Sequence, residues 1–170
     1  MLNYDVDLAV LFSALPTESF KTIARVEQSV FAIMAPGHPL ADFEKLSLSQ
    51  CVEFPLALHD SSFSVGQFLE AQAHSSRLAL KAAIKSNSFI LLQNYIMSSN
   101  AVGFEIGIGL DESDLDGLIK KPLVLNKVNT ISVQLIQLHG RTLSVAAAKF
   151  AEQIGAAFMA MSGENVDGPH

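Results

Sequence analysis

The sequence is poor in cysteine, tryptophan and charged residues, and these shortages exclude several kinds of protein. Cys51 is the single cysteine, and tryptophan is absent. One thiol cannot form an internal disulfide or a cysteine-based metal cluster. Only 16% of the residues are charged, below the ~25% of an average domain. The five histidines are scattered without the i, i+4 spacing of a helical metal site, so no metal ion is expected.

Positive charge is scarcer than negative charge. The chain has 11 Lys and Arg against 17 Asp and Glu, a formal net charge of −6, and the basic residues form no cluster. A nucleic-acid-binding domain needs a basic face that neutralises phosphates, and an anionic membrane surface attracts the same kind of face. We therefore expect this chain to bind neither DNA nor a membrane by itself.

Long hydrophobic segments are also missing. The first sixteen residues, MLNYDVDLAVLFSALP, have no basic start, no long apolar stretch and no small-residue cleavage site. The longest apolar runs are too short to span a bilayer. These features predict a soluble cytoplasmic protein.

Short apolar runs that alternate with helical patterns are what the sequence does contain. Hydrophobic residues make up 49% of the chain. The runs predict strands near 6–12, 29–35, 54–58, 78–84, 101–110, 118–125 and 130–138. Helical spacing and N-cap residues predict helices that start near 61 and 87, and a last helix from about 142 to 161. This alternation predicts an α/β architecture with largely parallel sheets.

Three segments, in this order, resemble the effector-binding domain of LysR-type transcriptional regulators. They are VDLAV from Val6, FAIMAPGHPLA from Phe31 and RTLSVAAAKF from Arg141. The second segment, an apolar strand that runs into His-Pro-Leu-Ala, is the most specific. Between the second and third segments, 87–107 fits the helix and glycine-rich strand of the family's second lobe. The resemblance therefore covers nearly the whole chain.

This resemblance implies a two-lobe α/β fold like that of the type II periplasmic binding proteins. Lobe I would contain 1–31 and 119–162, lobe II would contain 32–118, and 163–170 would form a tail. The family's lobe I begins with a strand, a helix and a strand before the segment that matches Val6. Those elements, the helix-turn-helix and the linker helix have no counterpart in this sequence. We therefore expect an N-terminally truncated domain with an incomplete lobe I and exposed apolar surface.

Phe12 and Ser13 follow the first predicted strand, where α/β proteins often bind their ligands. The ring of Phe12 favours an apolar or aromatic ligand over a small inorganic anion. Burial in the core explains Phe12 equally well.

Small polar residues follow two further strands. Ser61, Ser62 and Phe63 begin a predicted helix, and its free N–H groups would suit a carboxylate, although N-capping also explains the serines. Three successive polar residues on the next turn exceed what one cap needs, and Phe104 could close over a ligand. The predicted ligand-binding residues are thus Phe12, Ser13, Ser61, Ser62, Phe63, Ser86, Asn87, Ser88 and Phe104.

Catalytic and cofactor motifs are absent from the sequence. It contains no Gly-x-Ser-x-Gly nucleophile motif, no phosphate-binding glycine loop with lysine and no suitably paired carboxylates. His38 lies in a Gly-His-Pro-Leu turn, and Cys51 has no basic neighbour that would favour a thiolate. Glu105 stands in an apolar strand, where it needs a partner if it is buried and none if it faces solvent. We therefore expect no catalytic residue, no cofactor and no enzymatic activity.

The sequence predicts a ligand-sensing domain that binds a small-molecule effector between its two lobes and modulates transcription. The resemblance implies a homodimer or higher homo-oligomer, and DNA contact only through a helix-turn-helix domain outside this chain. A solute-binding component of a transport system with the same fold is the alternative, which should carry a secretory signal. A small α/β enzyme is a third class.

Overall fold

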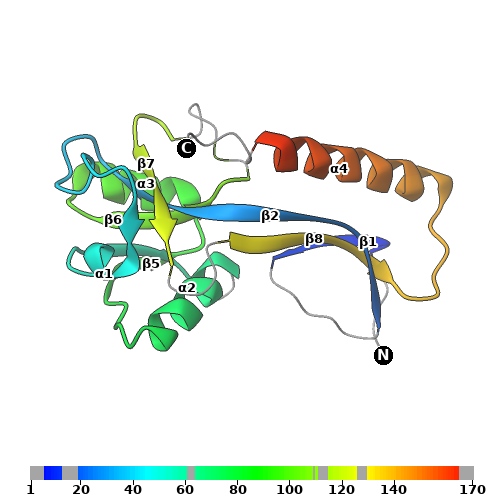
Figure 1. The fold of residues 1–170 in the computed structure, drawn as a ribbon, viewed down its shortest axis with the longest axis horizontal. Coiled ribbons are helices and arrows are strands. Elements are labelled where there is room, and N and C mark those ends of the chain that lie inside the picture. Colours follow the sequence, from blue (N-terminus) through cyan, green and yellow to red (C-terminus); the bar gives the residue numbers. More distant parts are fainter. Residues whose placement is uncertain are drawn as a thin grey trace. The chain divides into compact units, whose positions relative to one another are not determined.

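A computed structural model describes residues 6–12, 19–60, 64–108, 110, 115–125 and 130–164 (Figure 1). The chain divides into two compact units: unit 1 comprises Met1–Glu27 and Ser132–His170, and unit 2 comprises Gln28–Ile131. Two strands, β2 (Phe20–Met34) and β8 (Thr130–Leu138), cross the boundary between the units.

Unit 1 contains a sheet with the strand order β1-β8-β2. β1 (Leu8–Phe12) pairs antiparallel with β8, so that Leu8 lies opposite Gln137 and Phe12 opposite Val133. β8 and β2 are hydrogen-bonded neighbours as well. The long helix α4 (Val145–Glu164) lies alongside β2 and β8 (Figure 1). In the described part of this unit, one helix therefore lies beside a sheet of three strands.

Helix α4 leaves part of that sheet uncovered. Ala151 and Phe158 are buried, but a groove of about 540 Å³ is lined by residues of the helix and of β2. Apolar side chains on the surface of unit 1 are Val6, Val10, Phe20, Ile23, Val145, Phe150 and Met159. Exposed apolar surface was expected for lobe I, and unit 1 has it.

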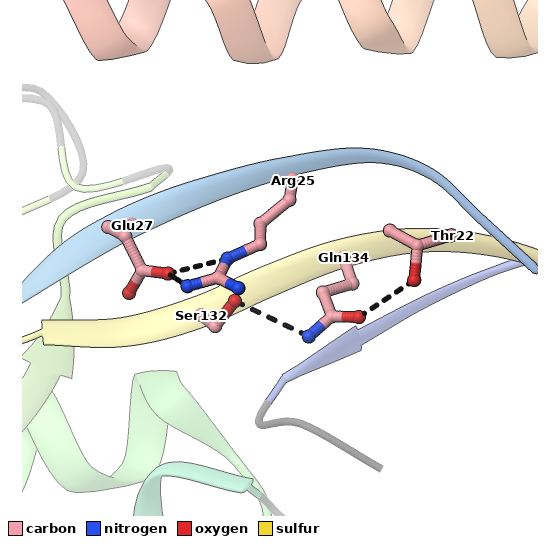
Figure 2. A network of polar contacts seen from close by, with 5 residues as sticks. All are labelled: Thr22, Arg25, Glu27, Ser132 and Gln134. Carbon is pink, nitrogen blue, oxygen red and sulfur yellow. Dashed lines mark hydrogen bonds and ion pairs between the residues drawn. The ribbon is translucent and has the colours of Figure 1, made fainter. Parts of the chain in front are cut away.

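A polar network lies on the exposed side of β2 and β8 (Figure 2). The hydroxyl of Thr22 donates to Gln134 Oε1 over 3.1 Å, and Gln134 Nε2 donates to the hydroxyl of Ser132 over 3.5 Å. Next to them, Arg25 Nε donates to Glu27 Oε1 over 2.8 Å. The Arg25–Glu27 ion pair is exposed and therefore adds less than about 1 kcal/mol to stability.

Unit 2 contains a mixed sheet with the strand order β5-β4-β6-β2-β7-β3. The remaining strands of this sheet are β3 (Leu46–Ser47), β4 (Leu56–His59), β5 (Ala82–Ser86), β6 (Val102–Ile106) and β7 (Ile119–Val124). β4 is parallel to both β5 and β6, and β3 is parallel to β7. β2 is antiparallel to both β6 and β7. The prediction of an α/β fold is confirmed, but the sheet is mixed rather than largely parallel.

Helices lie on both faces of this sheet. The short α1 (Leu48–Cys51) begins with a capping box between Ser47 and Gln50, while α2 (Ser64–Ser75) follows β4 and α3 (Phe89–Ser98) follows β5. α3 packs directly on β6, since a Cβ at Gly103 would meet Ile96 at 2.6 Å. α2 contacts the opposite face, where Glu70 pairs with Lys85. In the described part of the chain, no helix is long and apolar enough to cross a membrane.

His38 organises the turn that follows β2. Its Nδ1 accepts a hydrogen bond from the backbone N–H of Leu40 over 3.1 Å, and its ring lies 4.6 Å from the ring of Phe54. The side chain is buried. Burial lowers the pKa of His38 below 6.5, an effect partly offset by the backbone of Asn100. The neutral imidazole is therefore the form that fits this turn.

We expect His38 to make the protein less stable in acid. Below pH 6.5 the unfolded chain takes up a proton that folded His38 resists, so the free energy of unfolding falls as the pH decreases toward the lowered pKa. His38→Asn keeps an acceptor for Leu40 and should remove this part of the pH dependence. Urea unfolding between pH 5 and 8 tests this, with His74→Asn on the exposed surface of α2 as the matched control. Equal pH slopes for the wild type and His38→Asn would contradict it.

Candidate functional site

Side chains from four neighbouring strands line up at one edge of the unit 2 sheet. His59 is the last residue of β4 and lies opposite Ser86, the last residue of β5. Ala57 lies opposite Gly103, and continuation of that register places Glu105 of β6 opposite His59. Glu105 in turn lies opposite Phe31 of β2. We call Ser86, His59, Glu105 and Phe31 the edge row.

The centre of the edge row is a contact between an imidazole and a carboxylate. His59 Nε2 contacts Glu105 Oε1, and the two side chains are 6% and 14% exposed. A carboxylate removed from water needs a hydrogen-bonding or charged partner, and His59 supplies one. The question that the sequence left open about Glu105 is thereby answered: the residue is largely buried and paired.

The edge row lies on the face of the sheet that α3 covers. His59 and Glu105 follow Ala57 and Gly103 at a spacing of two, so all four side-chain positions face the same way. Below the row, Ala57 belongs to a buried apolar cluster with Ile33 and Leu92, against which Phe31 and Phe89 pack. The His59–Glu105 pair thus lies at the end of a sheet face that is otherwise apolar.

Ser86, Asn87 and Ser88 form one turn at the end of the edge row. The hydroxyl of Ser86 accepts a hydrogen bond from the Ser88 N–H over 3.0 Å. The hydroxyl of Ser88 accepts from the Leu91 N–H over 3.3 Å and caps α3. Both serines therefore stabilise the local backbone, while Asn87 between them is exposed. The structure brings these three predicted residues together.

Two of the other predicted residues, Phe12 and Phe104, are among the described residues. Phe12 ends β1 in unit 1, opposite Val133, and is half-buried. Phe104 is 2% exposed and points to the face of β6 opposite that of Glu105. Ser13, Ser61, Ser62 and Phe63 lie outside the described residues. The assignment of these residues to a ligand site stays a prediction.

The first turn of α2 lies close to the end of β4. A Cβ at Gly66 in this turn would lie 2.9 Å from the backbone oxygen of Asp60 and 3.0 Å from that of His59. A larger residue would push the start of α2 away from the end of β4. Gly66 thus permits the close approach of α2 to this strand.

The ammonium group of Lys120 lies next to Phe31, which is the last residue of the edge row. The Nζ of Lys120 lies 5.7 Å from the centre of the Phe31 ring and donates to the backbone oxygen of Leu110 over 2.9 Å. The aromatic face stabilises the ammonium electrostatically. The edge row, the turn Ser86–Ser88 and Lys120 therefore provide hydroxyl, amide, carboxylate, imidazole, aromatic and ammonium groups.

The sequence does not single out His59, which is one of five scattered histidines without metal-ligand spacing. The available signal was Glu105, a carboxylate in an apolar strand that requires a partner if buried. The sequence could not say which residue would be that partner.

Reactive groups are few in the described part of the chain. Burial raises the pKa of the Cys51 thiol to about 12, so the thiol stays protonated at neutral pH. The described residues contain no group of three His, Cys, Asp or Glu placed to hold a metal ion. The edge row can supply hydrogen bonds and apolar contacts to a small polar molecule.

The sheet topology and the two units define a class of protein. The fold is the α/β fold of the type II periplasmic binding proteins, as predicted from the sequence. The family model for the LysR substrate binding domain matches residues 1–159, and the chain belongs to this family. No curated protein matches the sequence.

Solved structures of LysR regulators have the same fold. HinK from Pseudomonas aeruginosa is 20% identical with a TM-score of 0.71, over 89% of this chain and 53% of that one. The effector binding domain of QuiR in complex with shikimate is 16% identical, with a TM-score of 0.71, over 91% and 74%. The CcmR regulatory domain of Synechocystis in complex with 2-PG is 14% identical, with a TM-score of 0.70, over 94% and 75%. The chain thus spans about half the length of HinK.

We expect His59 and Glu105 to be energetically coupled. His59→Ala leaves the Glu105 carboxylate without its imidazole partner and should lower the free energy of unfolding by about 3 kcal/mol. The double substitution His59→Ala/Glu105→Ala should cost less than the two single changes together, because it leaves no unpaired carboxylate. Urea unfolding measures all three, with His74→Ala as the exposed control. Strict additivity would show that the contact contributes nothing.

Proposed function

We propose that this chain is the ligand-sensing, effector-binding part of a LysR-type transcriptional regulator. The observation that carries the proposal is the match to the LysR substrate binding domain over residues 1–159. The edge row supports it, because the carboxyl ends of strands are where α/β proteins bind ligands. Two structural neighbours, QuiR and CcmR, were solved with shikimate and 2-PG bound.

The effector site in this proposal includes the turn Ser86–Ser88 and the neighbouring edge row. Phe12, Ser13, Ser61, Ser62 and Phe63 are assigned to it from the sequence, whereas Phe104 is buried on the opposite face of β6 and is left out of this turn and row. The exposed amide of Asn87 offers both a donor and an acceptor. The serine hydroxyls next to it can each donate one hydrogen bond while they accept one from the backbone.

Effector binding changes the balance between two arrangements of the lobes in this proposal. A ligand shifts such a balance only by as much as its affinity differs between the two states. β2 and β8 run through both units and are therefore the segments through which such a change would pass. The whole protein would act in the cytoplasm as a homodimer or higher homo-oligomer, and bind DNA through a helix-turn-helix domain outside this chain. It would have no enzymatic activity.

The transport alternative has no observation in its favour. The solved structures reported above are transcriptional regulators.

A metabolite screen against the 170-residue chain tests the proposal. An effector at a hundred times its Kd should stabilise the chain by about 2.7 kcal/mol and raise Tm by about 5 to 10 °C. Asn87→Ala removes an exposed amide without removing the cap of α3, and should weaken binding about three- to tenfold. Asn94→Ala, an exposed position on the same helix, is the matched control.

Two results would contradict the proposal. The first is a broad screen in which no compound raises Tm. The second is a ligand whose affinity falls equally in Asn87→Ala and Asn94→Ala, which would place the site away from this turn.

A further inference from the structure

We propose that Glu105 determines which effectors this chain accepts, and that it selects small molecules carrying a hydroxyl or amino hydrogen-bond donor. This inference rests on the proposed function and names the ligand class of the same site. It depends on where Glu105 lies, how His59 holds it and which charges surround it.

Glu105 is level with the carboxyl ends of the neighbouring strands. It lies in line with His59 and Ser86, which are the last residues of β4 and β5. Its side chain is 14% exposed, so it is mostly buried without being cut off from the surface. A ligand bound at Ser86–Ser88 would therefore meet the edge row next, with Glu105 as its carboxylate.

His59 fixes the orientation of this carboxylate. The contact uses Oε1 of Glu105 and Nε2 of His59. An ionised carboxylate has about four lone-pair sites and no donor, so one bond to His59 leaves it able to accept others. Because the side chain is restrained by its partner, an incoming donor does not have to order it first. This is the arrangement of an acceptor prepared for a donor group on a ligand.

The carboxylate of Glu105 itself opposes a compact anion at this position. Asp60 directly follows His59, and Asp60 N donates to the backbone oxygen of Ser86. Lys85 faces the other side of the sheet, where it pairs with Glu70 on α2, and exposed His74 is on α2 too. The ammonium of Lys120 lies over Phe31 and bonds to the backbone of Leu110. A dense anion beside Glu105 would meet a carboxylate, whereas a hydroxyl or amine would be accepted by it.

The rings beside the pair complete the ligand class. Phe31 is the neighbour of Glu105 on β2, and Phe89 opens α3 immediately after Ser88. Both pack against the same apolar cluster. We therefore infer a ligand with an apolar or ring-shaped body and at least one hydroxyl or amino donor.

Matched pairs of compounds test this inference. The probes are shikimate with cyclohexenecarboxylate and para-hydroxybenzoate with benzoate, together with inorganic phosphate. In each pair, the first compound has hydroxyl donors that the second compound lacks. For wild-type protein, titration calorimetry should give a preference of about tenfold for the hydroxylated member of a bound pair, and no binding of phosphate.

The variants compare two carboxylates of the same chain. Glu105→Gln keeps the size and one acceptor but loses the charge, which roughly halves the strength of the hydrogen bond, so the preference should fall from about tenfold to about threefold. Glu70→Gln removes the same charge from the other face of the sheet and should leave the preference unchanged. The wild-type preference needs no variant, so the test does not depend on whether Glu105→Gln folds.

Three results would overturn the inference. They are equal affinity for the members of each pair, an unchanged preference in Glu105→Gln, and failure of every probe to bind. The proposed function is tested separately, by the wider metabolite screen and the Asn87→Ala comparison, so the two failures can be told apart.

Discussion

The register of the unit 2 sheet is the constraint on which the candidate site depends. Successive side chains of a strand point to opposite faces, so a slip of one residue between β4 and β6 would place His59 and Glu105 on different faces. The carboxylate would then be desolvated on the α3 face without its imidazole. The pairing of Ala57 with Gly103 therefore decides both the sheet geometry and the chemistry at its edge. The register brings His59 and Glu105 together, and their contact in turn favours this register over a slipped one.

Close packing beneath the edge row holds this register in place. Gly103 leaves no room for a Cβ between β6, Ile33 and Ile96, so α3 lies directly on the sheet. The turn that starts α3 carries Ser86 and Ser88, whose hydroxyls bind backbone N–H groups. A site on a turn of this kind is positioned by the helix and the strand that it connects. The proposed binding residues are thus positioned by the same packing of α3 on the sheet that forms the apolar core.

The predicted elements match the observed ones where a segment carries a clear local pattern of its own. Thr130–Leu138 is a strand as predicted, because β-branched residues and alternation mark it locally. β2 begins at Phe20 rather than Ser29, since its polar first half is held by pairing with β8, which no local pattern reveals. β3 and α1 were not predicted at all. They are two and four residues long, too short for a periodic signal.

The sequence by itself determined the family, the α/β class and the polar turn Ser86–Ser88, because motifs, hydrophobic periodicity and caps are local properties. It also identified Glu105 as a carboxylate in an apolar strand. Only the tertiary structure decided that His59, 46 residues earlier, is its partner. The same structure buries Phe104 on the opposite face. Both results depend on which strands are neighbours and in what register, and that is settled by the packing of the whole sheet rather than by any segment alone.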